Sequence, residues 1–205
     1  MTELLFKARR NAQERAENYA LLQEAVLKCK ICGLCKNRKN VVLGEGDITS
    51  GIMFVGEGPG EVEDNTGRPF VGPAGQLLTK ILVAAGFSRE KVYITNIVKC
   101  RPPRNRVPSI EETFSCQCWL EAQIALICPR IIVSLGNTPL KWFMHGSDGI
   151  TKMRGRWSKW QGIDYMPMYH PSYLLRNDSR AKDGPKAQTW KDIQQVKARY
   201  DEIMG

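Results

Sequence analysis

The chain has 205 residues, of which 42% are hydrophobic and 25% are charged, and it carries a net charge of +9 and seven cysteines. This composition is typical of one globular domain over residues 1–205. It excludes a collagen-like or membrane-spanning chain, since no apolar run approaches the ~20 residues that cross a bilayer. The N-terminal segment lacks the apolar stretch of a secretory signal peptide, so we expect a cytoplasmic protein without a membrane partner.

The first half of the chain begins with an amphipathic helix, predicted over residues 2–28, and continues into a cysteine-rich segment. A short extended piece, NVVLGEG at 40–46, leads to a buried strand predicted at 51–57. The strand leads into the glycine-rich stretch GEGPGEVEDNTGRPFVGPAG, which we predict to be a loop. Pro73 suits the first turn of the helix that follows, which ends at Gly86.

Helices and short strands alternate through the second half of the chain. Ser109 is the predicted N-cap of a helix over 110–127, Asn137 the predicted cap of a short helix, and 185–204 the closing helix. Apolar, β-branched runs predict the strands 92–98 and 130–136 and a weaker strand at 164–170. Such alternation predicts an α/β fold with three αβα layers around a central, mainly parallel four-stranded sheet.

Polar side chains stand at the ends of three predicted strands. Glu57 ends the first strand, Asn96 lies near the end of the second, and His170 ends the fourth. In open α/β sheets, ligands bind beyond the carboxyl ends of the parallel strands. The sequence therefore predicts that these three side chains meet at one ligand-binding edge of the sheet.

The cysteines indicate a metal centre. An odd number of cysteines in a cytoplasmic chain argues against a disulfide framework. Two pairs have spacings that suit a shared metal or iron–sulfur cluster: Cys29 with Cys32, and Cys100 with Cys116. Cys35 and Cys118 are also possible ligands, and Cys128 is expected to pack as a small hydrophobic residue. The spacing alone does not decide between zinc and iron–sulfur.

The positive charge is concentrated in three segments rich in Pro, Gly and Asn, namely 99–106, 151–160 and 174–186. Basic loops with apolar neighbours suit contacts to phosphates together with insertion between bases. A nucleic-acid partner is therefore predicted, and a generally basic surface is the alternative.

Five stretches, taken together, resemble the family 4 uracil-DNA glycosylases, which contain an iron–sulfur cluster: CKICGL, GEGPGEVEDNTGRPFVGPAG, TNIVKCRPPRNRVPSIEE, IIVSLGNTPL and HPSYLLRN. The resemblance covers residues 25–200 and implies a four-stranded parallel sheet between helices. It also implies a [4Fe–4S] cluster held by Cys29, Cys32, Cys100 and Cys116. Cys35 and Cys118 fall outside the motif positions.

The resemblance implies removal of uracil from DNA by hydrolysis of its N-glycosidic bond, after the base has flipped into a pocket. Phe70 would stack on the base, and the Asn96 amide would read uracil O4 and N3 together. His170 would donate a hydrogen bond to O2, where negative charge develops as the bond breaks.

The glycine-rich stretch supplies the other implied site residues. Its glycines allow main-chain amides to approach the base, so Gly58 and Pro59 are expected to line the pocket together with Glu57. Glu57 would position the base or the attacking water. Glu63 is a second candidate for orienting the water or the cationic sugar, and Asp64 could compete for that role.

The residues after the histidine are expected to bind DNA. Leu174 or Leu175 would fill the gap left by the flipped base while Arg176 holds a phosphate. No lysine stands at a motif position where it could form a Schiff base, so we expect a monofunctional, monomeric glycosylase of single- or double-stranded DNA. The alternatives are a catalytically inactive iron–sulfur nucleic-acid-binding protein and an iron–sulfur electron carrier.

Overall fold

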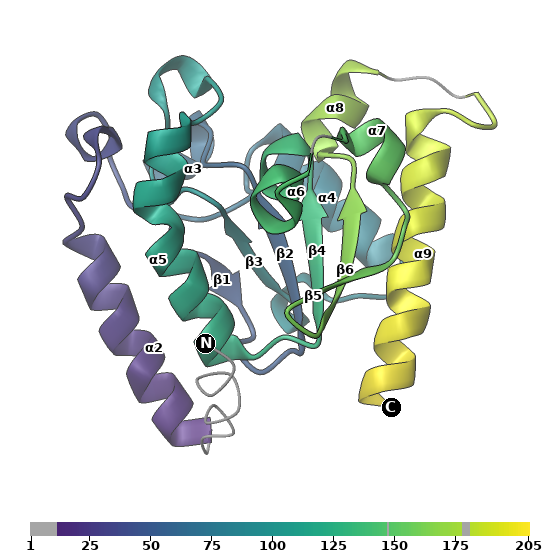
Figure 1. Ribbon diagram of the computed structural model, residues 1–205, viewed down its shortest axis with the longest axis horizontal. Helices are drawn as coiled ribbons and strands as arrows, with labels where there is room; N and C mark the ends of the chain where they lie inside the picture. The colour runs from purple at the N-terminus through teal and green to yellow at the C-terminus, as the bar shows by residue number, and fades with distance from the viewer. Residues whose placement is uncertain (1–11, 147, 178–180) are drawn as a thin grey trace.

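The computed structural model describes residues 12–146, 148–177 and 181–205. Its centre is a six-stranded sheet with the strand order β1-β3-β2-β4-β6-β5 (Figure 1). The four inner strands run parallel to one another: β3 Tyr93–Asn96, β2 Ile52–Gly56, β4 Ile131–Leu135 and β6 Ile163–Met168. The edge strands β1 (Glu45–Gly46) and β5 (Ser158–Trp160) are antiparallel to their neighbours.

The sequence predicts the four parallel strands and a short extended piece that includes β1, but it does not predict β5. The edge strands contain only two and three residues, which is too short for a period-two pattern to emerge. The parallel strands are buried along their whole length, as their apolar sequences require. Because these strands are parallel, their carboxyl ends lie on one edge of the sheet, the edge at which the sequence predicts ligand binding.

Helices cover both faces of the sheet, which confirms the predicted αβα class (Figure 1). Alternate residues of β2 separate the two cores. Met53 and Val55 pack toward α5 (Ile110–Ile127) and α6 (Asn137–Met144), and Ile52 and Phe54 face the opposite side. That side is covered by α4 (Pro73–Ala84) and α9 (Pro185–Met204). Outside α5 lies α2 (Ala12–Leu27), which packs on α5 through a small core of its own.

Two of the predicted helix starts are confirmed and one is wrong. Pro73 occupies the first turn of α4, and Ser109 caps α5 by accepting a hydrogen bond from the amide of Glu112. Asn137, however, is the first residue of α6, and its cap is Gly136, whose φ of 96° suits glycine. The first ten residues of the predicted helix over 2–28 lie outside the described residues, so only the part from Ala12 is confirmed.

The stretch predicted to be a loop contains a short helix, α3 (Glu61–Thr66), which the sequence analysis missed. The remaining short elements are α7 (Ile150–Met153), α8 (Pro171–Arg176) and the single turns η1 (Gly33–Lys36), η2 (Arg89–Lys91) and η3 (Pro103–Asn105). Among the helices that the structure describes, none is both long and apolar enough to span a bilayer.

Candidate active site

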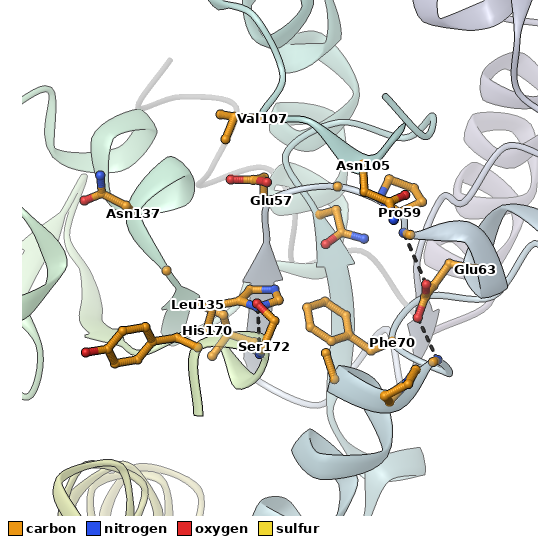
Figure 2. A pocket seen from close by; sticks show the side chains of 18 of the residues that line it. Glu57, Pro59, Glu63, Phe70, Asn105, Val107, Leu135, Asn137, His170 and Ser172 are labelled. Carbon is orange, nitrogen blue, oxygen red and sulfur yellow. Dashed lines mark hydrogen bonds between the residues drawn. The ribbon is translucent and has the colours of Figure 1, made fainter. Parts of the chain in front are cut away.

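A cleft of about 780 Å³ opens at the carboxyl edge of the parallel strands. Its size lies within the range of small-molecule and substrate sites. Glu57, Asn96 and His170 all line it, so the predicted convergence at the sheet edge is found in the structure (Figure 2). Phe70, Gly58 and Pro59, which come from the glycine-rich stretch, line it too.

Asn96 ends β3 at the floor of the cleft, where its side chain is only 1% exposed. Its Oδ1 atom has no hydrogen-bond partner among the described residues. A buried amide oxygen without a partner costs roughly 1–3 kcal/mol, so the site is built for a ligand that donates to it. Gly56 makes the space, since a Cβ atom there would lie 2.5 Å from Asn96 Oδ1 and 2.4 Å from Phe70 Cζ.

Phe70 forms an apolar wall of the cleft beside the histidine. The ring centroids of Phe70 and His170 lie 5.7 Å apart. Phe70 has a φ of 51°, a left-handed conformation that is uncommon for an aromatic residue. Its main chain also lies directly against Gly75, where an added Cβ would come within 1.9 Å of the Phe70 carbonyl. The ring is therefore held by its backbone as well as by its neighbours.

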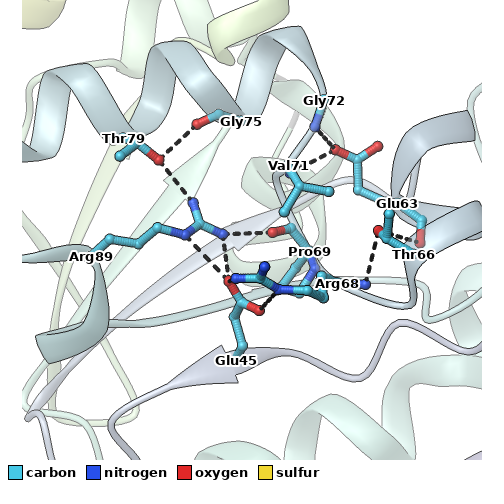
Figure 3. Close-up of polar contacts among 10 residues, drawn as sticks. All are labelled: Glu45, Glu63, Thr66, Arg68, Pro69, Val71, Gly72, Gly75, Thr79 and Arg89. Carbon is cyan, nitrogen blue, oxygen red and sulfur yellow. Dashed lines mark hydrogen bonds and ion pairs between the residues drawn. The ribbon is translucent and has the colours of Figure 1, made fainter.

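The chain on either side of Phe70 is fixed by two charged side chains (Figure 3). On one side, the guanidinium of Arg89 donates 2.6 Å to the Pro69 oxygen and pairs with Glu45 at 2.8 Å. On the other side, Glu63 Oε1 accepts from the amides of the two residues after Phe70, at 3.0 and 2.8 Å. Its Oε2 accepts from the amide of Gly60 at 3.2 Å.

Three main-chain amides thus occupy the carboxylate of Glu63. This arrangement supports a role in holding the stretch that carries Phe70, and it leaves Oε2, which accepts one hydrogen bond, as the oxygen that could orient a water. Asp64 does not compete for that role. It is buried and accepts from the amides of Lys39 and Asn40, at 2.9 and 3.3 Å, and it is absent from the cleft lining.

His170 stands between β6 and α8 and caps that helix. Its Nδ1 accepts from the amide of Ser172 at 3.1 Å and lies 2.8 Å from the Ser172 hydroxyl. Burial, followed by the positive charge of Arg176, lowers the pKa of His170 to about 4. The ring is therefore neutral at pH 7. Since Nδ1 accepts, the ring proton resides on Nε2, which leaves an N–H donor for a ligand.

Glu57 follows β2 directly, and its Oε2 accepts a hydrogen bond from the hydroxyl of Thr138 near the start of α6. Thr138 is not among the site residues predicted from the sequence. The signal was present, because Thr138 follows the end of β4 and so lies at the same edge as the other strand ends. Another part of the cleft lining is formed by the end of η3 and the segment after it, including Asn105 and Val107.

Only part of the predicted DNA-binding set is available for contact. Leu174 is 1% exposed and packs inward, so its predicted contact with DNA is wrong; on a short helix that caps the sheet edge, one leucine must face the core. Leu175 is 47% exposed, and Arg176 lines the cleft. In the basic segment 99–106, Lys99 is fully buried and cannot reach a phosphate.

Five cysteines surround a second, small cavity beside α5: Cys29, Cys32, Cys35, Cys100 and Cys116. Cys118 and Cys128 do not line it. Within the described residues, no three potential ligands converge on the position of a single metal ion. The thiols thus surround a space rather than meet at a point.

The sulfur atoms of this cavity have N–H donors around them. Trp119 Nε1 lies 3.3 Å from Cys29 Sγ, and an Arg38 nitrogen lies 3.1 Å from Cys100 Sγ. The Lys99 amide lies 3.4 Å from Cys116 Sγ. Such donors stabilise thiolate ligands. These donors fit a cluster ligated by cysteines alone, and no histidine is among the described residues that line the cavity.

Comparison with known proteins identifies the family. Residues 43–194 match the model of the uracil DNA glycosylase superfamily. A type-4 uracil-DNA glycosylase of Thermotoga maritima is 54% identical over 80% of this chain and 87% of its own length. One from Sulfurisphaera tokodaii is 45% identical over 78% and 77%. A type-5 uracil-DNA glycosylase of Pyrobaculum aerophilum is 34% identical over 66% and 67%. On this evidence the chain belongs to the uracil DNA glycosylase superfamily.

Proposed function

We propose that this chain is a uracil-DNA glycosylase of base excision repair, which hydrolyses the bond between uracil and deoxyribose and leaves an abasic site. The observation that carries the proposal is the buried Asn96 amide with an unpaired oxygen, set beside the Phe70 wall. Uracil has a flat ring, an acceptor at O4 and a donor at N3, and it satisfies both features together. Relatives named as type-4 uracil-DNA glycosylases support the same activity.

Recognition then depends on one amide. With uracil in the cleft, Asn96 Nδ2 donates to O4 and Oδ1 accepts from N3–H, while Phe70 stacks on the ring. Cytosine has a donor in place of O4 and an acceptor at N3, so both hydrogen bonds fail. The cleft is much larger than a single base, which leaves room for the flipped sugar and its phosphates.

The reaction breaks the bond between C1′ and N1, and the electron pair stays with the base. Negative charge develops on uracil O2, which the Nε2–H of neutral His170 stabilises. Water adds to C1′ and loses a proton, which balances the charge of the departing uracil anion. Glu57, held by Thr138, orients this water and stabilises the positive charge that develops on the sugar. Glu63 acts as a positioning residue for Phe70, and the Gly58 and Pro59 backbone lines the pocket beside the base.

We further propose that Cys29, Cys32, Cys100 and Cys116 hold a [4Fe–4S] cluster. The N–H donors at the cysteine cavity support this ligand set, and Cys35 is the alternative fourth ligand because it lines the same space. These cysteines would let a bound cluster cross-link the segment 29–32, the loop after β3 and α5, a structural role that requires no electron transfer. A DNA-repair role also fits the expected cytoplasmic, monomeric enzyme.

A glycosylase assay tests this function. Iron-containing protein is incubated with an oligonucleotide bearing one uracil, and abasic sites are then cleaved with alkali. We expect strand scission that requires uracil, is lost in His170→Ser and is retained in the matched variant His145→Ser. Serine at position 170 preserves a good helix cap, so folding is retained. If the wild-type protein binds DNA but gives no scission, the enzyme assignment is wrong and a binding protein remains.

A further inference from the structure

Val107 lines the cleft, and its apolar side chain is 63% exposed to solvent. Val62 on α3 also lines the cleft but is less exposed, at 42%. Figure 2 shows Val107 on one side of the cleft beyond Glu57, with His170 and Ser172 on the other side, where α8 begins. No internal packing accounts for an exposed valine at this position. An apolar tip at the mouth of a base-binding cleft fits insertion into DNA.

The support beneath Val107 is stiff. The guanidinium of Arg106 forms two hydrogen bonds with Glu112, at 2.7 and 2.6 Å, and donates to the Val107 oxygen at 3.1 Å. Glu112 in turn closes the capping box of α5 with Ser109. Prolines at 102, 103 and 108 fix the backbone on both sides. The tip therefore loses little conformational entropy when it enters a stack.

The surroundings of Val107 suit a DNA strand better than a protein partner. Arg104, in the basic segment 99–106, is exposed and lies three residues before Val107, so it can hold a phosphate close to the valine. On α8, the exposed Leu175 precedes Arg176, and Arg176 lines the cleft. Each of the two segments thus carries an exposed apolar side chain close in sequence to an arginine.

We infer that Val107 is a second wedge, in addition to Leu175, and that it enters the DNA stack beside the flipped nucleotide. Together the two side chains fill the space that the flipped base leaves and hold the neighbouring bases apart. This inference rests on the proposed function, and it adds a residue whose contribution is specific to duplex DNA. A single strand has no stacked partner strand to hold open, so the wedge contributes little there.

The test compares Val107→Ala with the matched control Ile110→Ala. Ile110 is 90% exposed, lies three residues further on and does not line the cleft. For Val107→Ala we expect kcat/KM to fall about tenfold on a duplex containing a U·G pair, as the loss of two buried methyl groups predicts, and about twofold or less on a single strand. Ile110→Ala should change neither substrate by more than about twofold, and Val107→Ile should retain duplex activity.

A second measurement separates this inference from the proposed activity. A 2-aminopurine placed next to a uracil analogue that resists hydrolysis reports base flipping by its fluorescence, without any cleavage. We expect Val107→Ala to lower the fluorescence rise in duplex DNA, and Ile110→Ala to leave it intact. Equal losses on single and double strands, or equal losses in the two variants, would overturn the wedge. Absence of uracil release by the wild type, with flipping intact, would overturn only the proposed function.

Discussion

The Lys99 Nζ atom donates a hydrogen bond of 2.6 Å to the main-chain oxygen of Asn96, so a buried amine, whose pKa burial lowers to about 7, supports the residue that reads the base. Nζ also donates to Thr95 Oγ1 at 2.8 Å and to Gln123 Oε1 at 2.6 Å. Lys99 precedes Cys100 in the chain, and its amide contacts Cys116 Sγ. One side chain and its amide thus connect the floor of the cleft to the cysteine cavity.

Replacing Lys99 with Met removes these three hydrogen bonds while keeping most of the side-chain volume. We expect free uracil, measured as a competitive inhibitor, to bind about tenfold more weakly, because Asn96 loses its anchor. Tyr165→Phe is the control, since it removes a buried hydrogen bond to Ser134 away from the cleft. Both variants should unfold at a lower temperature, but an inhibition constant that stays unchanged in Lys99→Met would reduce Lys99 to a structural role.

The change Asn96→Asp should weaken discrimination between uracil and cytosine. A carboxylate at this position accepts but does not donate, so it no longer serves uracil O4 and it tolerates the cytosine amino group. The ratio of excision rates on matched uracil and cytosine oligonucleotides should fall by roughly tenfold or more. An unaltered ratio, at whatever overall rate, would contradict the role given to this amide.

Two substitutions of Glu63 distinguish a role in positioning Phe70 from a direct role in the chemical step. In Glu63→Gln the remaining carbonyl oxygen still accepts from the amides of Val71 and Gly72, whereas Glu63→Ala loses both hydrogen bonds. We expect Gln to retain activity within about tenfold, and Ala to lose roughly a hundredfold together with affinity for free uracil. If Gln is as inactive as Ala in single-turnover assays while still binding uracil, Glu63 acts on the water directly.

His170 makes stability depend on pH in a defined direction. Its pKa is about 4 in the folded protein and about 6.5 when unfolded, so between these values the unfolded chain binds the additional proton. The wild type should therefore lose stability relative to His170→Ser as the pH falls from 6.5 to 4. We expect a change on the order of 2 kcal/mol, kept below the full shift because His170, taken as a whole residue, is not fully buried. Denaturant titrations at several pH values measure it, and a constant difference would show that His170 is not buried neutral.

Iron content tests the ligand set. Cys100→Ala should lower the iron from about four atoms per chain to well below one and remove the visible absorption band. Cys118→Ala is the matched control, because Cys118 is exposed and outside the cavity, and it should keep its iron. Cys35→Ala decides the remaining question, since loss of iron there would replace one of the four assigned ligands.

The sequence predicted the parts of the site that follow from strand order. Glu57, Asn96 and His170 meet because parallel strands end at one edge, a rule that requires only their positions in the chain. The partners of side chains could not be predicted in the same way. Nothing in the spacing indicates that Glu63 turns to three amides or that Thr138 reaches Glu57. Likewise, which of two adjacent leucines is buried depends on the exact phase of a helix of six residues.

The short helix α3 connects the cleft to the cysteine-rich region. Its adjacent residues Glu63 and Asp64 accept hydrogen bonds from two different segments. Glu63 binds the stretch that bears Phe70, and Asp64 binds the segment that leaves the cysteine-rich region. The middle of the helix therefore ties these two segments together. A shift of the segment that leaves the cysteine-rich region would be passed through α3 to the stretch that bears Phe70.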